Sequence, residues 1–249
     1  MNAPRSRPST WATVGAAALL ALLSLAVYST RDDQAITDVV LLGDSIAQEA
    51  FPYLQPLSNI TVLERYFGGT APCDWLDKDL LAARRRVVVV SFTGNSVTPC
   101  MADGAGGFLR GQALVDKYRV DLTALVGRIR STYARVVLVG QPQRGPGAGD
   151  AINGNLEVAG INTIYGELAE SGSVSFVDAG AAVEASDGAF AAVLPCLPGE
   201  PECGAAGNNP VRSDDGVHLC PGVTVGPCPT YSSGAFRFAT AIADAIKAL

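Results

Sequence analysis

The chain has 249 residues and a formal net charge of −6, from 18 Lys and Arg against 24 Asp and Glu. This length suits one globular domain with a short additional segment. The net negative charge argues against a nucleic-acid partner, because such proteins need clustered Lys and Arg. The chain has one histidine, His218, so any chemistry that needs histidine is limited to that position.

The N-terminal segment is typical of an export signal. Arg5 and Arg7 precede residues 11–28, which are mostly apolar and uncharged, and Arg31 follows them. A basic flank before an apolar run places the N-terminus in the cytoplasm. The run is near the lower limit for a membrane span and longer than a usual signal-peptide core. We therefore favour an uncleaved membrane anchor, with a cleaved signal peptide as the alternative.

These features divide the chain into three parts. Residues 1–30 are predicted to be the signal or membrane anchor, residues 31–37 a linker, and residues 38–249 the folded domain. In both alternatives the folded domain is exported. We therefore expect it in the cell envelope, outside the cytoplasm, either anchored to the membrane by the N-terminal segment or secreted.

Beyond residue 37, apolar runs alternate with amphipathic stretches. The apolar runs are rich in Val and lack period-two alternation, as expected of strands buried on both faces of a parallel sheet. Alternating strands and helices predict an α/β fold, a three-layer sandwich around a five-stranded sheet. The predicted strands are 38–42, 61–67, 87–92, 135–139 and 174–177, and the predicted helices are 46–53, 74–83, 107–133, 155–170 and 231–249.

Two predicted loops interrupt this alternation. Residues 141–150 are rich in Pro and Gly, and residues 195–229 hold four cysteines together with His218. A long segment without secondary structure is uncommon unless it is functional or cross-linked. We expect the second loop to be closed by disulfides and to carry part of the functional site.

The six cysteines fit an oxidising compartment, because their number is even and the domain is predicted to be exported. Zinc is the competing interpretation, but the chain has no C-x-x-C pair and its one histidine has another role. We therefore expect no metal. Local spacing suggests the pairs Cys196–Cys203 and Cys220–Cys228, which leaves Cys73–Cys100.

Polar or glycine residues follow the first three predicted strands. Ser45 follows the first strand, Gly68 and Gly69 follow the second, and Asn95 follows the third. The carboxyl ends of parallel strands meet at one edge of the sheet, where ligands of such folds bind. We therefore expect these groups to converge on one site.

The residue types at this edge predict a serine nucleophile with its base. The Ser45 hydroxyl becomes a good nucleophile when a base takes its proton. His218 would be that base, and Asp215 would orient it, since the two are three positions apart and both reach one side of a turn. Backbone N–H groups of Ser45 and of a glycine, with the Asn95 amide, would form an oxyanion hole.

In this order, the motifs resemble those of the SGNH (GDSL-type) hydrolase superfamily over roughly residues 38–246. The resemblance implies a flavodoxin-like α/β/α sandwich, no cofactor, and ester or thioester hydrolysis, carbohydrate deacetylation or acyl transfer. The third motif, usually G-x-N-D, departs from the pattern and is Thr-Gly-Asn-Ser here. The matching residues are Gly43-Asp44-Ser45 for the first motif, Gly69 (with Gly68 as the alternative) for the second, Asn95 for the third and Asp215-x-x-His218 for the fifth.

Two hypotheses concern the disulfides. In the flavodoxin-like strand order, the second and third strands flank the first. A Cys73–Cys100 bridge would then tie the loops of Gly69 and Asn95 together over Ser45. The alternative is a bridge that only stabilises the fold. Because the base lies in a disulfide-closed loop, we also expect activity to fall on reduction.

Three functions remain open from the sequence. The first is hydrolysis of an O-acyl ester of an envelope glycan or lipid through an acyl-Ser45 intermediate. The second is acyl transfer from the same intermediate to a sugar hydroxyl. The third is a catalytically silent glycan-binding domain, against which the intact catalytic residue types argue. A G-x-S-x-G hydrolase is disfavoured, because Ala47 stands in place of the second glycine.

Overall fold

The structure is a computed structural model that describes residues 38–54, 56, 60–80, 87–132, 134–146, 154–170, 172, 174–222 and 226–249. The predicted anchor and linker, residues 1–37, lie outside the described residues. The described residues belong to one compact unit, Ile36–Leu249. In this part of the chain, no helix combines the length and the apolar character that a membrane span requires.

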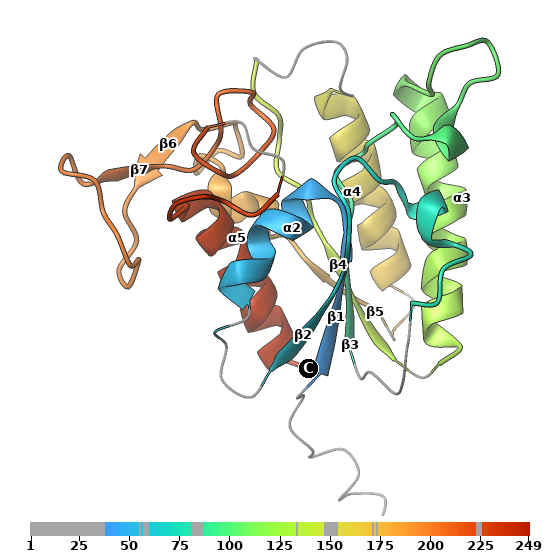
Figure 1. Ribbon diagram of the computed structural model, residues 1–249, viewed down its shortest axis with the longest axis horizontal. Helices are drawn as coiled ribbons and strands as arrows, with labels where there is room; N and C mark the ends of the chain where they lie inside the picture. Colours follow the sequence, from blue (N-terminus) through green and yellow to red (C-terminus); the bar gives the residue numbers. More distant parts are fainter. Residues whose placement is uncertain are drawn as a thin grey trace, which may run out of the picture. The chain divides into compact units, whose positions relative to one another are not determined.

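A five-stranded parallel sheet forms the centre of this unit (Figure 1). Its strand order is β2-β1-β3-β4-β5, which confirms the predicted flavodoxin-like topology. The order reverses at β1, so the carboxyl end of β1 is the point where such sheets bind ligands. The strands, all predicted from the sequence, are β1 (Asp38–Gly43), β2 (Thr61–Tyr66), β3 (Val87–Ser91), β4 (Arg135–Val139) and β5 (Val174–Val177).

Two helix layers cover the two faces of the sheet (Figure 1). Successive side chains of a strand point to opposite faces. Val40 and Leu42 of β1 pack in one core with helices α3 and α4, whereas Val39 and Leu41 pack in the other with α2 and α5. Because both faces are covered, the Val runs show no polar alternation. The helices are α2 (Ser45–Leu54), α3 (Gly111–Arg130), α4 (Asn155–Ala169) and α5 (Ser233–Lys247).

The helix predicted over 74–83 is wrong for the residues described there. A short 3-10 helix, η1 (Pro72–Trp75), gives way to turns, and residues 81–83 lie outside the described part. Arg128 of α3 donates to the carbonyl oxygens of Trp75, Leu76 and Lys78. A helix would use such carbonyls for its own hydrogen bonds, so a contact from another element replaces the helical turn.

Two helices begin later than the sequence predicts. α3 begins at residue 111 instead of 107, because Phe108 pairs with Ala102 in an antiparallel bridge. α5 begins at residue 233 instead of 231, because the side chain of Ser232 caps it and accepts the N–H of Ala235 at 3.1 Å. Local capping and pairing therefore set these two boundaries.

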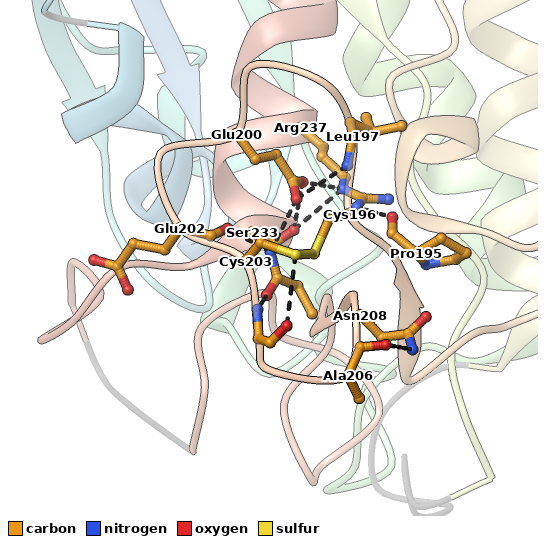
Figure 2. The surroundings of a disulfide bond; sticks show 12 residues. Pro195, Cys196, Leu197, Glu200, Glu202, Cys203, Ala206, Asn208, Ser233 and Arg237 are labelled. Carbon is orange, nitrogen blue, oxygen red and sulfur yellow. Dashed lines mark hydrogen bonds and ion pairs between the residues drawn. A yellow bond between two sulfur atoms is a disulfide. The ribbon is translucent and has the colours of Figure 1, made fainter.

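The loop predicted over 195–229 contains an unpredicted β-hairpin. Strands β6 (Val193–Pro195) and β7 (Asn208–Pro210) pair antiparallel, and the Cys196–Cys203 disulfide closes part of their connection (Figure 2). Three-residue strands are too short to show a periodic pattern. All three suggested disulfides are confirmed: Cys73–Cys100, Cys196–Cys203 and Cys220–Cys228.

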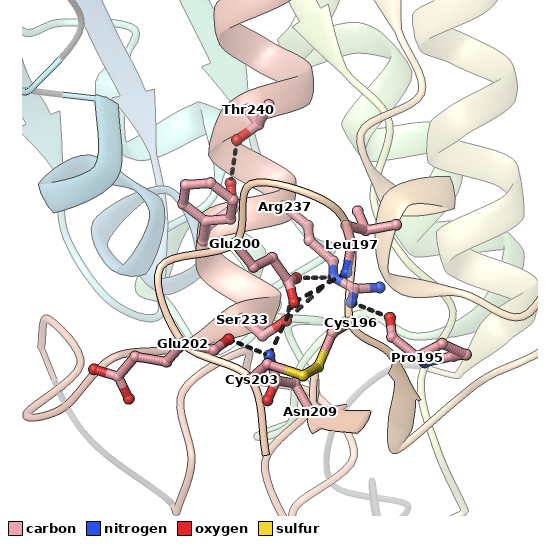
Figure 3. A network of polar contacts seen from close by, with 12 residues as sticks. Pro195, Cys196, Leu197, Glu200, Glu202, Cys203, Asn209, Ser233, Arg237 and Thr240 are labelled. Carbon is pink, nitrogen blue, oxygen red and sulfur yellow. Dashed lines mark hydrogen bonds and ion pairs between the residues drawn. A yellow bond between two sulfur atoms is a disulfide. The ribbon is translucent and has the colours of Figure 1, made fainter. Parts of the chain in front are cut away.

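A buried ion pair attaches this connection to α5 (Figure 3). Glu200 accepts hydrogen bonds from Arg237 at 2.5 Å and from Ser233 at 2.7 Å, and Arg237 also donates to the Pro195 oxygen at 2.5 Å. Burial raises the pKa of Glu200, but the hydrogen bonds that Glu200 accepts from Arg237 and Ser233 oppose this effect, and the resulting pKa is lowered. A buried pair is tolerated when its remaining hydrogen-bonding capacity is filled in this way.

Candidate active site

The end of β1 delivers Ser45 to the carboxyl edge of the sheet. A side chain at Gly43 would meet the backbone oxygen of Ser91 at 2.2 Å, so a glycine is required there. Asp44 follows, and its Oδ1 accepts the N–H of Ile46 at 3.1 Å, which caps α2. Ser45 is therefore the first residue of α2, at the positive end of the helix dipole.

The three residues predicted to form a triad lie in one hydrogen-bonded chain. His218 Nε2 is 3.0 Å from Ser45 Oγ, and His218 Nδ1 is 2.6 Å from Asp215 Oδ2. Oδ1 of Asp215 accepts the backbone N–H groups of Val217 at 2.8 Å and His218 at 2.9 Å, which closes the turn. The side chains Ser45, His218 and Asp215 are linked in the same order as those of a serine-hydrolase triad.

These contacts stabilise the ionised form of Asp215. Burial alone would raise its pKa, but the hydrogen bonds from the His218 ring and from the backbone of His218 and Val217 outweigh burial and lower the pKa to about 2. The side chains of His218 and Asp215 are 19% and 22% exposed. The His218 ring is therefore paired with an ionised carboxylate and still accessible from solvent.

Asp44 is a buried centre of hydrogen bonds beneath the site, a role that the sequence did not suggest. Its Oδ2 accepts the N–H of Thr93 at 2.6 Å, the hydroxyl of Thr93 at 2.8 Å and the amide of Asn95 at 2.9 Å. Burial raises the pKa of Asp44, and the bonds from Thr93 and Ile46 oppose that rise. Thr93 replaces the usual first glycine of its motif, and its hydroxyl here binds Asp44.

The three predicted oxyanion donors come from neighbouring loops. Gly69 has φ +81° and lies in a turn closed by the Thr70 N–H. In the described part of the chain, nothing accepts the N–H of Gly69 or Ser45. Asn95 Nδ2 donates to Asp44 and, at the longer distance of 3.4 Å, to the Thr70 oxygen. The alternative, Gly68, lies closer to the nucleophile, since a Cβ there would be 3.8 Å from that of Ser45.

A disulfide and a carboxylate join the loops that follow Gly69 and Asn95. Cys73 in η1 is bonded to Cys100 in the 3-10 helix η2 (Pro99–Met101). Asp74 accepts the hydroxyl of Thr98 at 2.6 Å and the N–H of Ala71 at 2.9 Å. Asp74 and the two sulfurs are close enough to bind a metal ion, but metals bind thiolates, and both sulfurs are oxidised here.

The loop that carries His218 has a second support that the sequence did not reveal. The buried Arg212 donates from Nη2 to the oxygens of Gly216 at 3.1 Å and Val217 at 2.7 Å. Burial lowers the pKa of Arg212 to about 10. Gly216 has φ +69° and lies against the backbone of Gly145. These contacts fix the turn between Asp215 and His218.

Comparison with known proteins is informative at the level of structure. No protein-family model matches the sequence, and no curated protein matches it significantly. Several solved structures are similar to this chain, and three of them serve as examples. They are a GDSL-like lipase from Bacteroides thetaiotaomicron (16% identity, 89% of this chain and 97% of that chain, TM-score 0.56), a catalytic mutant of an acetylxylan esterase from Geobacillus stearothermophilus (16%, 85% and 94%, 0.56) and a candidate acylhydrolase from Bacteroides fragilis (19%, 87% and 89%, 0.55). The chain has the α/β/α fold of the SGNH (GDSL-type) hydrolases.

Proposed function

We propose that this protein is an exported serine esterase that forms an acyl-Ser45 intermediate. The observation that carries the proposal is the chain of contacts from Ser45 Oγ to His218 Nε2, at 3.0 Å, and from His218 Nδ1 to Asp215, at 2.6 Å. The GDSL-like lipase and acetylxylan esterase among its structural neighbours support an ester substrate.

In the proposed first step, Ser45 Oγ attacks the carbonyl carbon of the ester while His218 Nε2 takes the hydroxyl proton. The oxyanion that forms would be stabilised by the N–H groups of Ser45 and Gly69 and by the Asn95 amide, whose long hydrogen bond to the Thr70 oxygen would give way to one with the oxyanion. Asp215 is ionised and stabilises the imidazolium. His218 then gives the proton to the leaving alcohol, whose bond to the acyl carbon breaks.

In the second step, water attacks the acyl-Ser45 carbonyl and gives a proton to His218. The bond to Ser45 Oγ breaks, the acid leaves, and His218 returns the proton to Ser45. The same residues serve both steps, because each is the reverse of the other with water in place of the alcohol.

The substrate that we propose is an O-acyl ester of an envelope glycan or lipid. The acetylxylan esterase among the structural neighbours supports a glycan ester. The partial exposure of His218 supports access by a large substrate. Export to the cell envelope is supported by the three disulfides, which form in oxidising compartments, and by the basic and apolar N-terminal sequence.

The test is hydrolysis of a short-chain aryl ester by the full-length protein. We expect Ser45→Ala and His218→Ala each to lower kcat/KM by at least about 10³-fold, the effect of losing a triad member. Ser131→Ala, an exposed serine at the end of α3, is the control and should match the wild type. Equal turnover by the wild type and all three variants would exclude the proposed esterase mechanism. Product release only in the presence of a sugar acceptor would instead identify an O-acyltransferase.

A further inference from the structure

Helix α2 presents a polar stripe to the C-terminal part of the chain. Ser45, Glu49 and Tyr53 are four residues apart, so they lie on one face of the helix. Each makes a hydrogen bond to a later segment. In the same order, the partners are His218 Nε2 at 3.0 Å, the Leu219 N–H at 2.7 Å and the Ser232 N–H at 2.6 Å.

Leu219, the residue that follows His218, is bound through both its N–H and its carbonyl oxygen. Glu49 Oε2 accepts the N–H of Leu219, and the hydroxyl of Ser232 donates to the oxygen of Leu219 at 2.6 Å. Leu219 is fully buried. Because Leu219 follows His218 directly, Glu49 attaches the base to the helix that begins with the nucleophile.

Glu49 is a buried carboxylate that the proposed triad does not use. Its residue is 1% exposed, and Oε1 has no hydrogen-bond partner among the described residues. Burying a carboxylate with an unfilled oxygen costs free energy. Burial also raises the pKa of Glu49 to about 7, against the opposing charge of His218 and the N–H of Leu219. Glu49 therefore changes charge near neutral pH.

The charged groups that act on Glu49 are His218, Asp215 and Arg212. All three lie in residues 212–218, which we call the base loop. Along α2, the next titratable group on the same face is Tyr53, whose pKa is raised by burial. Among these groups, His218 is the one that becomes positive during the proposed reaction. An ionised Glu49 would stabilise that charge together with Asp215.

A neighbouring charge on α5, which packs against α2, is already compensated. Arg237 is bonded to Glu200, and both side chains are buried. This leaves the base loop as the source of the charges that couple to Glu49.

We propose that Glu49 is a positioning residue that fastens the base loop to the nucleophile helix and supplies a second negative charge for the imidazolium of His218. Its consequence for catalysis rests on the proposed esterase function. The contact and the charge coupling are properties of the folded chain and can be measured without a substrate.

The presence of a single histidine makes this coupling directly measurable. Histidine labelled with ¹³C and ¹⁵N in the full-length protein reports only His218 by NMR. In Glu49→Gln, the midpoint of the ring titration should move to lower pH by about one unit, because the neutral amide no longer stabilises the imidazolium. The amide oxygen can still accept the Leu219 N–H, so the position of the loop is kept.

Glu170→Gln is the matched control, because Glu170 is an exposed glutamate that caps the end of α4. It should leave the midpoint at the wild-type value. An unchanged midpoint in Glu49→Gln would overturn the proposal. If Glu49→Gln does not fold, the wild-type curve decides: a coupled pair gives a broadened titration, whereas a simple one-proton curve contradicts the coupling.

A kinetic measurement then connects the coupling to catalysis. In Glu49→Gln, the acidic limb of the kcat/KM profile should shift by the same amount, and the plateau should fall about three- to tenfold. A purely structural role would leave the acidic limb unmoved. If the wild type does not cleave the ester but the His218 midpoint still shifts in Glu49→Gln, the esterase proposal fails and the coupling between Glu49 and His218 stands.

Discussion

Three carboxylates lie around Ser45 and His218, and each has a different balance of burial and hydrogen bonding. Asp215 accepts several hydrogen bonds, and its pKa falls to about 2. Glu49 accepts one from Leu219, and burial raises its pKa to about 7. Asp44 accepts four, yet its complete burial still raises its pKa. Carboxyl groups with separated pKa values can hold different protonation states at one pH.

The raised pKa of Glu49 predicts a pH-dependent cost to folding. Between its unfolded value near 4.5 and its folded value of about 7, the folded state binds the proton more tightly than the unfolded state. The free energy of unfolding therefore falls as pH rises through this window. Glu49→Gln removes the cost, so at pH 8 the variant should be more stable than the wild type by about 2–3 kcal/mol.

Urea unfolding of both proteins across this window is the measurement. The difference between wild type and Glu49→Gln should be smallest near pH 4.5 and should grow up to about pH 7. A constant difference at all pH values would show that Glu49 does not titrate in the folded protein. A more stable but slower variant is expected where a destabilising group serves activity.

The residues that the sequence could predict are those with a local pattern. Ser45 follows a strand, and Asp215 and His218 are three positions apart, so residue type and spacing were sufficient to expect these three side chains in contact. The roles of Glu49 and Arg212 depend on contacts between distant parts of the chain or on burial, which spacing does not reveal. The signal in the sequence for Glu49 is its position four residues after Ser45, on the same helix face.

At the scale of the elements, the disulfide between η1 and η2 predicts a kinetic effect. Replacing Cys73 and Cys100 by Ser should lower kcat for the aryl ester by about tenfold, less than the loss of a whole oxyanion donor. The same change should lower stability by about 2–4 kcal/mol. The control replaces Cys196 and Cys203 by Ser. It removes a bridge in a segment that Glu200 also attaches to α5, so kcat should be unchanged while the protein is folded.

Equal kcat values for both double variants and the wild type would reduce the Cys73–Cys100 bridge to a stabilising role. The predicted loss of activity on reduction also concerns the Cys220–Cys228 bridge, which begins two residues after His218. Contacts from Glu49 and Arg212 hold the same loop without a covalent bond. Reduction should therefore act most strongly through the loops of the oxyanion hole.

Elements with long apolar patterns were predictable, and elements defined by tertiary contacts were not. The Val-rich β3 is buried over its whole length, and its sequence shows this directly. The segment after η1 has helical residue types, but Arg128 takes its carbonyl groups. The β6–β7 hairpin pairs only three residues on each strand, and the Cys196–Cys203 bridge closes its connection. Neither contact can be derived from local propensity.

At the scale of the molecule, the sheet order explains why distant residues meet. β1 lies between β2 and β3, so Ser45 is flanked by the loops of Gly69 and Asn95. His218 lies in the segment that precedes α5, and α5 packs on the same face of the sheet as α2. The α/β alternation predicts this architecture, because parallel strands bring their carboxyl ends to one edge.

The most direct measurement of the central claim is covalent labelling of the native full-length protein with a fluorophosphonate, followed by peptide mapping. We predict a stoichiometric adduct on Ser45, absent in Ser45→Ala and formed at least about 10²-fold more slowly in His218→Ala, because the base activates the hydroxyl. Label on a different serine, or no label on the native protein under conditions that modify a known serine esterase, would contradict the assignment of Ser45 as an activated nucleophile.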